Sequence, residues 1–273
     1  MTSASKLVVS DVSLRFGGVN ALSEVSFDVA PASLTALIGP NGAGKTSMFN
    51  CVSGAYRPTS GEILLDGAPI TRLARHRIAR MGLARSFQTP VVLAGQSVLD
   101  NVMAGRYLQG RHGILSTVLG LSAVRRDEDA NRGRVEHILR LLDLTSLRGV
   151  CVDDLSYGTK KRVEMARVIA QEPTLLLLDE PMAGMTLDEK EAMSAYILAV
   201  RQELETAVLL VEHDMGVVMQ LAEHVVVLNF GRKISEGSPD EVQRDPAVIS
   251  AYLGAAPDGA EQTTAVSTEG DQP

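Results

Sequence analysis

Apolar positions in the first part of the chain either alternate with polar ones or form short continuous runs, and both patterns are typical of strands. Residues 7–14 and 24–29 alternate, so they predict two paired strands. Residues 33–38 are almost continuously apolar and predict a short buried strand that ends in a glycine-rich turn. We expect a helix over residues 46–54 and a further strand over residues 61–66 to follow.

Helical periodicity replaces this pattern in the middle of the chain. The arginine-rich residues 71–84 indicate a helix. Residues 98–147 show no strand pattern and repeat their apolar positions at helical spacing, as at Val135, Ile138, Leu139 and Leu142. We therefore expect a helical subdomain, over about residues 90–160, that is inserted into a domain containing a sheet.

Helices and strands alternate again after the insertion. Helices are expected over residues 159–171 and 189–203, and strands over residues 175–178 and 207–211. This alternation predicts an α/β fold with a parallel sheet flanked by helices. Residues 1–254 form the predicted domain. Residues 255–273 lack an apolar period and are rich in small and polar residues, which predicts a disordered tail.

Composition and charge exclude some functions without indicating one. The chain has 273 residues and a net charge of −7, which argues against nucleic-acid binding because that needs a basic face. The arginines at 72, 75, 77, 80 and 85 fit a salt-bridged helix surface better than a nucleic-acid or lipid contact. Apolar runs stay below the roughly 18 residues of a membrane span, and residues 1–6 lack a signal core. Cys51 and Cys151 are expected to pack as reduced thiols.

A phosphate-binding loop is predicted by the run Gly39-Pro40-Asn41-Gly42-Ala43-Gly44-Lys45-Thr46, which fits G-x-x-x-x-G-K-[ST]. Its glycines let backbone N–H groups point at phosphate oxygens, and the helix that follows presents its positive end to the same anion. Lys45 can reach the β- and γ-phosphates, and the Thr46 hydroxyl can ligate Mg²⁺. Ser47 completes the predicted nucleotide-binding set. A chance glycine-rich turn is the alternative, which the flanking strand and helix disfavour.

Two adjacent acids, Asp179 and Glu180, follow the apolar run of residues 175–178. The carboxyl ends of parallel strands are where open α/β sheets bind ligands. Asp179 suits Mg²⁺, through water, and Glu180 can polarise the water that attacks a γ-phosphate. Capping of the helix after Pro181 is the alternative, which the upstream phosphate loop disfavours. ATP or GTP with Mg²⁺ is therefore predicted.

Between these two sites, the segment Leu155-Ser156-Tyr157-Gly158-Thr159 resembles LSGGQ, the signature motif of ABC ATPases. Other P-loop proteins share the loop and the acids but lack this element. The resemblance covers residues 7–254 and implies ATP as the nucleotide. It also implies a P-loop ABC ATPase core with a parallel sheet, an N-terminal antiparallel β-subdomain and an inserted helical subdomain. Ser156 and Gly158 are then expected to contact ATP held by a partner subunit.

The same resemblance implies roles for three further residues. Phe16, in Arg15-Phe16-Gly17-Gly18, would stack on adenine, with a plain core position as the alternative. Gln88 resembles the glutamine that touches Mg²⁺ or the attacking water, and a solvated loop residue is the alternative. His213 resembles the switch histidine that contacts the γ-phosphate. The implied catalytic residues are Glu180, His213 and Gln88, and the implied magnesium ligands are Thr46, Gln88 and Asp179.

Some positions depart from the family pattern, and others indicate a particular subfamily. Tyr157 and Thr159 replace a glycine and a glutamine of the signature, and Thr186 stands where many relatives have aspartate, which leaves open how this loop communicates across a dimer. Residues 230–237 and 245–254 resemble the branched-chain amino-acid uptake ATPases. The insertion around residues 107–134 suits the longer of the two ATPases of such systems.

These resemblances imply a subunit that powers an importer of branched-chain or other hydrophobic amino acids, at the cytoplasmic face of the inner or plasma membrane. The implied partners are a second ATPase subunit (identical or shorter), integral-membrane permeases and, indirectly, an extracytoplasmic substrate-binding protein; nucleic acid is not expected. Urea, amides or aromatic acids stay open as substrates. A soluble ABC ATPase acting on ribosomes or DNA is disfavoured because the chain has neither a second unit nor long coiled coils. A purely structural P-loop protein is disfavoured by Glu180 and His213.

Overall fold

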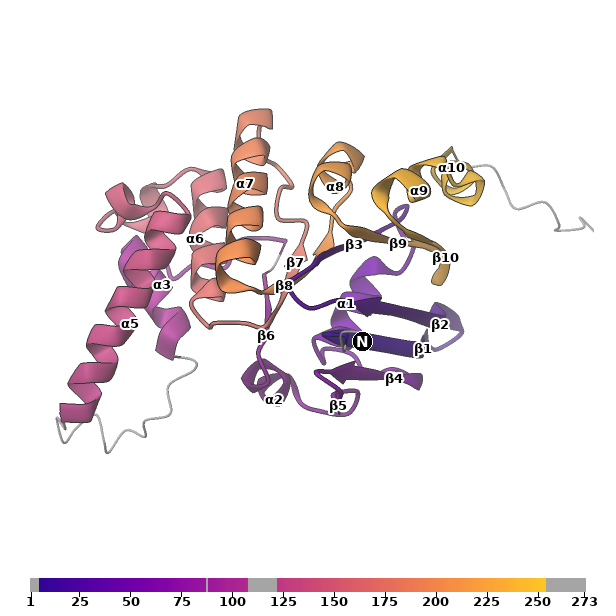
Figure 1. Cartoon of the computed structure of the whole chain (residues 1–273), viewed down its shortest axis with the longest axis horizontal. Helices are drawn as coiled ribbons and strands as arrows, with labels where there is room; N and C mark the ends of the chain where they lie inside the picture. The colour runs from indigo at the N-terminus through magenta and orange to yellow at the C-terminus, as the bar shows by residue number, and fades with distance from the viewer. Residues whose placement is uncertain (1–4, 87, 108–121, 254–273) are drawn as a thin grey trace, which may run out of the picture.

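The computed structural model describes residues 5–86, 88–107 and 122–253, and Figure 1 shows two sheets with helices between and beside them. The predicted tail at residues 255–273, Phe87 in the Gln88 segment and residues 108–121 of the expected insertion lie outside this described part. No helix among the described residues is long and apolar enough to cross a membrane.

The N-terminal strands form an antiparallel sheet in the order β2-β1-β4-β5. These strands are β1 (Leu7–Phe16), β2 (Val19–Val29), β4 (Ser60–Leu65) and β5 (Ala68–Pro69). Alternate residues of β1, such as Leu7, Val9 and Val12, are buried in one core with Phe49. The alternation in the sequence therefore corresponds to a sheet with one buried face, and the predicted antiparallel subdomain is confirmed.

The second sheet has the order β10-β9-β3-β8-β7-β6, in which every pair is parallel except β10 with β9. Its strands are β3 (Leu34–Ile38), β6 (Leu83–Arg85), β7 (Leu175–Asp179), β8 (Ala207–Val211), β9 (His224–Asn229) and β10 (Arg232–Gly237). The strands β3, β7 and β8 are buried at every position. They can be continuously apolar because helices or the other sheet cover both faces.

Helices cover the two faces of this sheet unequally. One face packs on α1 (Lys45–Val52) and the antiparallel sheet, and the other packs on α6 (Tyr157–Ile169), α7 (Leu187–Leu204) and α8 (Met215–Leu221). The chain then ends its described part in α9 (Pro239–Arg244) and α10 (Pro246–Leu253). Figure 1 shows α1 lying between the two sheets. This arrangement places the loop after β3 next to the end of β7.

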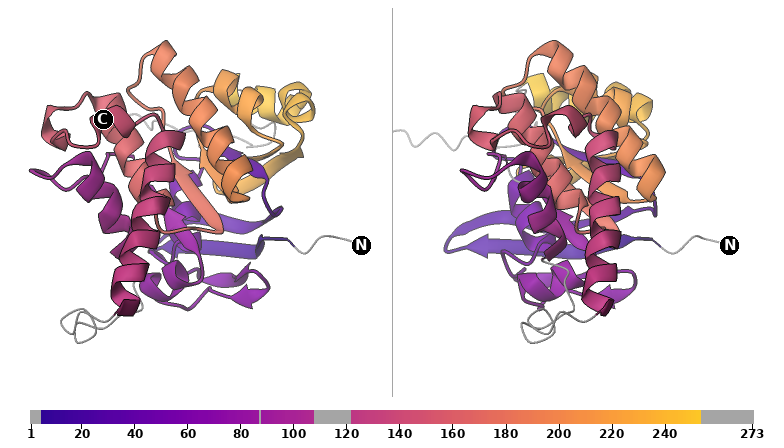
Figure 2. Two further views of the ribbon diagram at one scale, coloured as in Figure 1. Left: turned by 60° about the vertical axis from the view of Figure 1, so that its left-hand side comes forward. Right: turned by 90° about the vertical axis from the view of Figure 1, so that its left-hand side faces the viewer.

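The described part of the predicted insertion is mainly helical, although residues 90–97 are irregular and Ser97 forms an isolated β-bridge with Cys151. It contains α3 (Val98–Tyr107), α5 (Ser122–Leu141) and the short 3₁₀ turns η1 (Thr145–Leu147) and η2 (Val152–Asp154). Val135, Ile138, Leu139 and Leu142 are all buried, as their spacing indicated. Figure 2 shows α3 and α5 as a lobe beside the sheets, packed on α6.

The helix expected over residues 71–84 is wrong at its C-terminal end. The observed helix α2 (Arg75–Arg80) ends before Gly82, whose φ of 96° belongs to the left-handed region. Residues 83–85 then form β6, which pairs with β7 and extends the parallel sheet. Arg85 is consequently part of the sheet and not of an arginine-rich helix face. The prediction from periodicity failed because a strand of three residues is too short to show a pattern.

Candidate functional site

The phosphate loop connects the buried strand β3 to α1 and depends on glycines. Gly39, Gly42 and Gly44 have φ values of 148°, 79° and 105°. A Cβ on Gly39 would lie 2.1 Å from the carbonyl oxygen of Leu228, so the loop packs against β9 too closely for any side chain. The first turn of the loop is thus packed tightly against β9.

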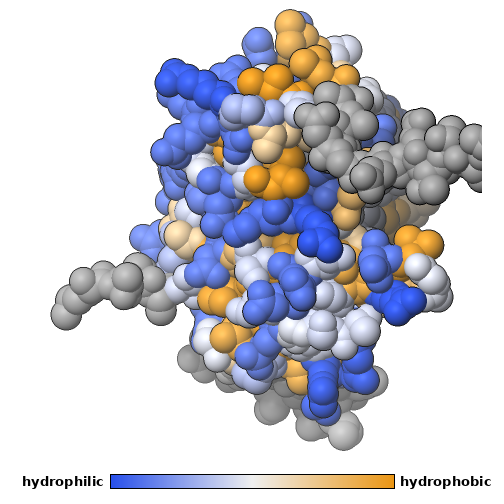
Figure 3. Space-filling model, turned by 90° about the vertical axis from the view of Figure 1, so that its right-hand side faces the viewer, coloured by the Kyte–Doolittle hydropathy of each residue, from blue (hydrophilic) through white to orange (hydrophobic). Residues whose placement is uncertain are grey.

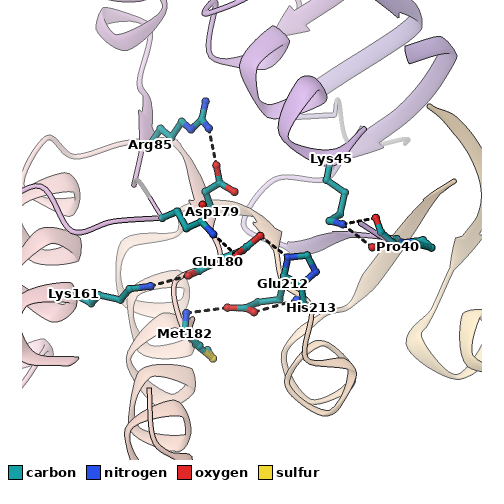
Figure 4. A network of polar contacts seen from close by, with 11 residues as sticks. Pro40, Lys45, Arg85, Lys161, Asp179, Glu180, Met182, Glu212 and His213 are labelled. Carbon is teal, nitrogen blue, oxygen red and sulfur yellow. Dashed lines mark hydrogen bonds and ion pairs between the residues drawn. The ribbon is translucent and has the colours of Figure 1, made fainter. Parts of the chain in front are cut away.

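Lys45 lies inside this loop, and the residue as a whole is 5% exposed. Its Nζ donates to the carbonyl oxygens of Gly39 at 2.6 Å and Pro40 at 3.0 Å (Figure 4). Burial lowers the pKa of Lys45, and the nearby carboxylates of Glu180 and Asp179 oppose that shift. A buried cation at the amino end of α1 favours an anion, because the helix dipole acts in the same direction.

A cavity of about 390 Å³ lies beside the loop, where a nucleotide base and sugar would have room. It is lined by Val19, Asn20, Ala21, Gly42, Ala43, Gly44, Lys45, Thr46, Ser47, Phe230 and Gly231. Figure 3 faces the side of β10 and the end of β2, and hydrophobic atoms there form small separate areas among polar ones. The cavity therefore combines the polar groups of the phosphate loop, such as Lys45 and Thr46, with apolar side chains such as Val19 and Phe230.

Two aromatic residues differ in their relation to this cavity. Phe16, the residue expected to stack on adenine, packs edge-on against Tyr56 with ring centroids 5.2 Å apart. The aromatic side chain that lines the cavity is Phe230, which is 78% exposed and has a φ of 45°. The N–H of the next residue, Gly231, donates to Ala43 of the phosphate loop at 2.9 Å, and this hydrogen bond fixes the turn. The sequence analysis missed Phe230, although an aromatic residue before a glycine between two strands is a detectable signal.

The two acids lie at the carboxyl end of β7, as expected. Asp179 is 6% exposed, and its Oδ2 accepts a hydrogen bond of 2.7 Å from Arg85 Nη2. Arg85 also donates to Asn50 Oδ1 at 2.7 Å and Ser53 Oγ at 3.0 Å, and so connects β7 to α1. The Thr46 hydroxyl and the Asp179 carboxylate are oxygen donors of the kind that Mg²⁺ prefers. Because Mg²⁺ keeps several water or phosphate ligands, two or three protein donors fit it.

The three residues predicted to be catalytic are brought together around the Glu180 carboxylate. Gln88 Nε2 donates to Glu180 Oε2 at 2.7 Å, and His213 Nε2 lies 2.5 Å from Glu180 Oε1 (Figure 4). They come from three separate segments, after β6, β7 and β8. Glu180 itself has a φ of 48°, which is uncommon for a residue with a side chain and costs on the order of 1–3 kcal/mol. Such strain is typical of functional positions.

Two buried charged residues support this group and were missed in the sequence analysis. Glu212 is 4% exposed and accepts hydrogen bonds from the backbone N–H groups of Met182 at 2.9 Å and His213 at 3.2 Å. Burial raises the pKa of Glu212. Lys161 is 3% exposed, and its Nζ donates to the carbonyl oxygen of Glu180 at 2.9 Å. Lys161 shares helical spacing with the buried Met165 and Val168, which is the signal that could have identified it.

The signature segment lies at the beginning of α6. Ser156 is the N-cap, and its Oγ accepts a hydrogen bond of 3.2 Å from the N–H of Thr159. Ser156 is exposed, whereas Gly158 is buried so closely against Glu189 that a Cβ would lie 2.4 Å from Glu189 Oε1. The hydroxyl therefore faces outward from a rigid helix start.

The three departures from the family pattern have structural partners. The ring of Tyr157 lies next to Gly184 and 5.5 Å from Lys161 Nζ. The Thr159 hydroxyl contacts Ser156 Oγ at 3.0 Å. Thr186 is the N-cap of α7 and forms a capping box with Glu189. Thr186 therefore caps the amino end of α7.

Comparisons with known proteins agree with this geometry. Residues 22–183 match the family described as ABC transporter, and residues 232–258 match the family described as branched-chain amino acid ATP-binding cassette transporter. Over 250 residues the chain is 38% identical to the high-affinity branched-chain amino acid transport ATP-binding protein BraF of Pseudomonas aeruginosa. It is 36% identical to the corresponding protein LivG of Escherichia coli. Both alignments cover 92% of this chain and 98% of the relative.

Solved structures show the same fold. A nucleotide-free ATP-binding cassette from an ABC transporter superposes with a TM-score of 0.78 and 27% identity, covering 91% of this chain and 98% of that one. Another cassette, in its ADP conformation, superposes with a TM-score of 0.79 and 28% identity, covering 92% of this chain and 99% of that one. The predicted fold class is thus confirmed.

Proposed function

The chain belongs to the ABC transporter family and is an ABC-type ATPase, and we propose that it powers an importer of branched-chain or other hydrophobic amino acids. The observation that carries the proposal is the convergence of Gln88, Glu180 and His213 around one carboxylate, at the sheet edge that also holds Lys45. The match of residues 232–258 to the branched-chain amino acid transporter family supports the substrate class.

The geometry supports ATP hydrolysis by an attacking water. Backbone N–H groups of the loop and Lys45 bind the phosphates, and the Glu180 carboxylate accepts the proton of the water as its oxygen bonds to the γ-phosphorus. The bond to the bridging oxygen breaks, and ADP and phosphate are released. His213 and Gln88 hold the two carboxylate oxygens in place. Mg²⁺, when bound, would neutralise phosphate charge, and Thr46 and Asp179, with Gln88, are the residues that would hold it.

A second subunit completes the proposed site. Ser156 is exposed at the amino end of α6, where its hydroxyl and the helix dipole suit a phosphate. In the proposed dimer, each signature segment faces the phosphate loop of the partner, and ATP lies between them. Bound ATP stabilises the closed dimer because only there do its phosphates contact both subunits. Hydrolysis removes the shared anion, and the dimer opens.

Membrane permeases are the proposed recipients of this motion, at the cytoplasmic face of the membrane. A groove of about 400 Å³ between α3 and α5 is lined by Asp100, Met103, Arg132 and Glu136 among others. Its mixture of charged and apolar groups suits a short helical segment of a permease. The groove belongs to the helical lobe that packs on α6, so it is mechanically connected to the signature segment.

Reconstitution tests the proposal. The chain is expressed with candidate permeases and a candidate substrate-binding protein, and uptake of radiolabelled leucine into ATP-loaded vesicles is measured. We expect leucine uptake that depends on ATP and is competed by isoleucine and valine but not by urea or benzoate. ATP hydrolysis without uptake of any of these solutes would reject the importer.

An export ATPase is the alternative function that the uptake test addresses. The chain is also 38% identical, over 231 residues, to a lipopolysaccharide export ATP-binding protein of Acidithiobacillus ferridurans.

A further inference from the structure

A buried lysine of the signature helix contacts the main chain of the catalytic glutamate. Lys161 lies on α6, which begins at Ser156, and its Nζ donates to the carbonyl oxygen of Glu180 at 2.9 Å. Figure 4 shows this contact on the side of Glu180 opposite to the phosphate loop. The hydrogen bond therefore joins the helix that begins with the signature to the strand end that carries the carboxylate.

The peptide unit between Glu180 and Pro181, which Lys161 contacts, has few other hydrogen bonds. Pro181 follows Glu180 and has no N–H, so the carbonyl oxygen is the hydrogen-bonding group of this peptide unit. It also accepts the N–H of Ala183 at 3.2 Å, within the local turn. On the other side of the residue, the N–H of Glu180 donates to Val211 at 2.9 Å. Of these two hydrogen bonds to the Glu180 carbonyl oxygen, the one from Lys161 comes from a separate element, the helix α6.

The conformation of Glu180 makes this contact important. Its φ of 48° lies in the left-handed region, which a residue with a side chain adopts only where the surroundings hold it. A change in the backbone conformation of Glu180 would change the direction of the carboxylate relative to His213 and Gln88. The hydrogen bond from its N–H to Val211 and the hydrogen bond from Lys161 to its carbonyl oxygen together oppose such a change.

The surroundings of Lys161 argue against a role in helix packing alone. Burial lowers its pKa, and the carboxylates of Glu212, Glu164 and Glu180 oppose this shift. A buried ammonium group is costly unless it is hydrogen-bonded, and an apolar residue would be the ordinary choice on this face of α6. What the lysine adds over an apolar residue is a charged donor directed at the Glu180 carbonyl.

We propose that Lys161 is a positioning residue that orients Glu180 and couples it to the signature helix. The inference rests on the proposed roles of Glu180 and Ser156. In the proposed dimer, Ser156 contacts the ATP of one site, while Lys161 of the same helix holds the catalytic carboxylate of the other. A shift of α6 on ATP binding is therefore transmitted to Glu180 of the opposite site.

Steady-state hydrolysis by the full chain with its permeases tests this. Lys161→Met keeps most of the side-chain volume and removes the donor, and we expect kcat to fall about tenfold to a hundredfold, because small misplacements of catalytic groups have effects of about that size. KM and the dissociation constant for ATP should stay within about twofold of wild type. Lys161→Arg, which keeps a charged donor, should recover most of the rate. Lys160→Met is the matched control, because Lys160 Nζ also donates to a main-chain carbonyl, that of Asp153 at 3.0 Å.

A double-mutant cycle separates positioning from a general structural effect. In the Glu180→Gln background, Lys161→Met should cause little further loss in single-turnover rate, because the group that it positions is already disabled. Multiplicative losses, an unchanged kcat, or equal slowing by Lys160→Met would overturn the inference. If Lys161→Met does not fold, Lys161→Gln replaces it in the same cycle. A wild-type chain without ATP hydrolysis would instead refute the proposed function.

Discussion

The phosphate-loop end of the parallel sheet and the amino end of α6 are both proposed to contact nucleotide, but they are built in opposite ways. At the sheet end, Lys45 and Asp179 are 5% and 6% exposed. Lys45 donates to two carbonyl oxygens of its own loop, and Asp179 accepts a hydrogen bond from Arg85 of β6. At the amino end of α6, Ser156 is exposed, and its described hydrogen bonds are with Thr159 in the same turn. The groups of the first region are enclosed by the chain itself, whereas the Ser156 hydroxyl of the second region faces the surface.

This difference follows from position in the fold. Strands β3 and β7 are central and buried, so the residues after them are enclosed by neighbouring segments. The amino end of α6 follows the helical insertion, and Gly158 fixes it against Glu189 of α7. An outward helix start that is held rigidly suits contact with a second subunit. The comparison therefore separates residues that are proposed to bind and react within the chain from residues that are proposed to complete the site of a partner subunit.

The largest effect is expected within the sheet-end region. Glu180→Gln should keep ATP binding and lower hydrolysis by roughly 10²–10⁴-fold, which is the usual cost of losing a positioned base. Lys45→Ala should abolish binding, because Lys45 supplies charge to the phosphates before reaction. Equilibrium nucleotide binding and phosphate release measure the two effects. Equal loss of binding in the two variants would contradict the division of roles.

The next prediction tests whether the second region acts in trans. Ser156→Arg should leave ATP binding by the isolated subunit intact and prevent closure and hydrolysis, because a bulky cation replaces a hydroxyl that is proposed to face the phosphate held by the partner subunit. Binding is measured on the isolated subunit, and phosphate release and ATP-dependent dimerisation on the assembled protein.

A mixture with Lys45→Ala makes this test sharper. In a mixed dimer, one site carries both defects and the other carries none, so some hydrolysis should return if one intact site suffices. If both sites must act together, hydrolysis stays absent, but ATP-dependent pairing in the mixture should exceed that of either variant alone. A Ser156→Arg subunit that hydrolyses ATP normally with its permeases would refute the composite site.

A smaller effect is expected at the edge of the cavity, where the structure and the resemblance favour different aromatic residues. Phe230→Asn should weaken ATP binding about fivefold to tenfold, since contact between an aromatic ring and a base is worth about 1–3 kcal/mol and this ring is largely exposed. Inorganic triphosphate, which has no base, should bind the variant as it binds wild type. Asparagine tolerates positive φ better than phenylalanine, so the melting temperature should not fall. If Phe16→Ala alone weakens binding, the adenine lies against Phe16.

How far the sequence predicts this molecule depends on how local each signal is. The apolar strand before Gly39 and the four leucines before Asp179 are local signals, and they placed Lys45, Asp179 and Glu180 on the correct elements. Strand β6 has three residues and follows an arginine-rich helix, so no local pattern distinguished it. Glu212 looks like a surface residue in the sequence, and only tertiary packing shows that it is buried. The helical spacing of Lys161 indicates a buried position, but only tertiary packing shows its contact with Glu180.

The last comparison concerns two helix caps and separates an effect on stability from an effect on hydrolysis in the second region. Ser156 and Thr186 are the N-caps of α6 and α7, and each accepts a hydrogen bond from an N–H of the first turn, that of Thr159 at 3.2 Å and that of Glu189 at 3.4 Å. Replacing such a cap by alanine costs about 1 kcal/mol of folding free energy, so Ser156→Ala and Thr186→Ala should lower stability to denaturant by similar amounts.

Their effects on hydrolysis should differ, because only the Ser156 hydroxyl is proposed to contact ATP of the partner subunit. Loss of one hydrogen bond to a charged group weakens an interaction by about 1.5–3 kcal/mol, so Ser156→Ala should slow hydrolysis by about tenfold or more. Thr186→Ala should change the rate less than about threefold, since the backbone N–H of residue 186 can still donate to the Glu189 carboxylate. Urea denaturation and phosphate release on both variants measure the two quantities. Equal hydrolysis rates in the two variants at equal stability would show that Ser156 is only a helix cap. The proposed contact of Ser156 with ATP of the partner subunit would then be rejected.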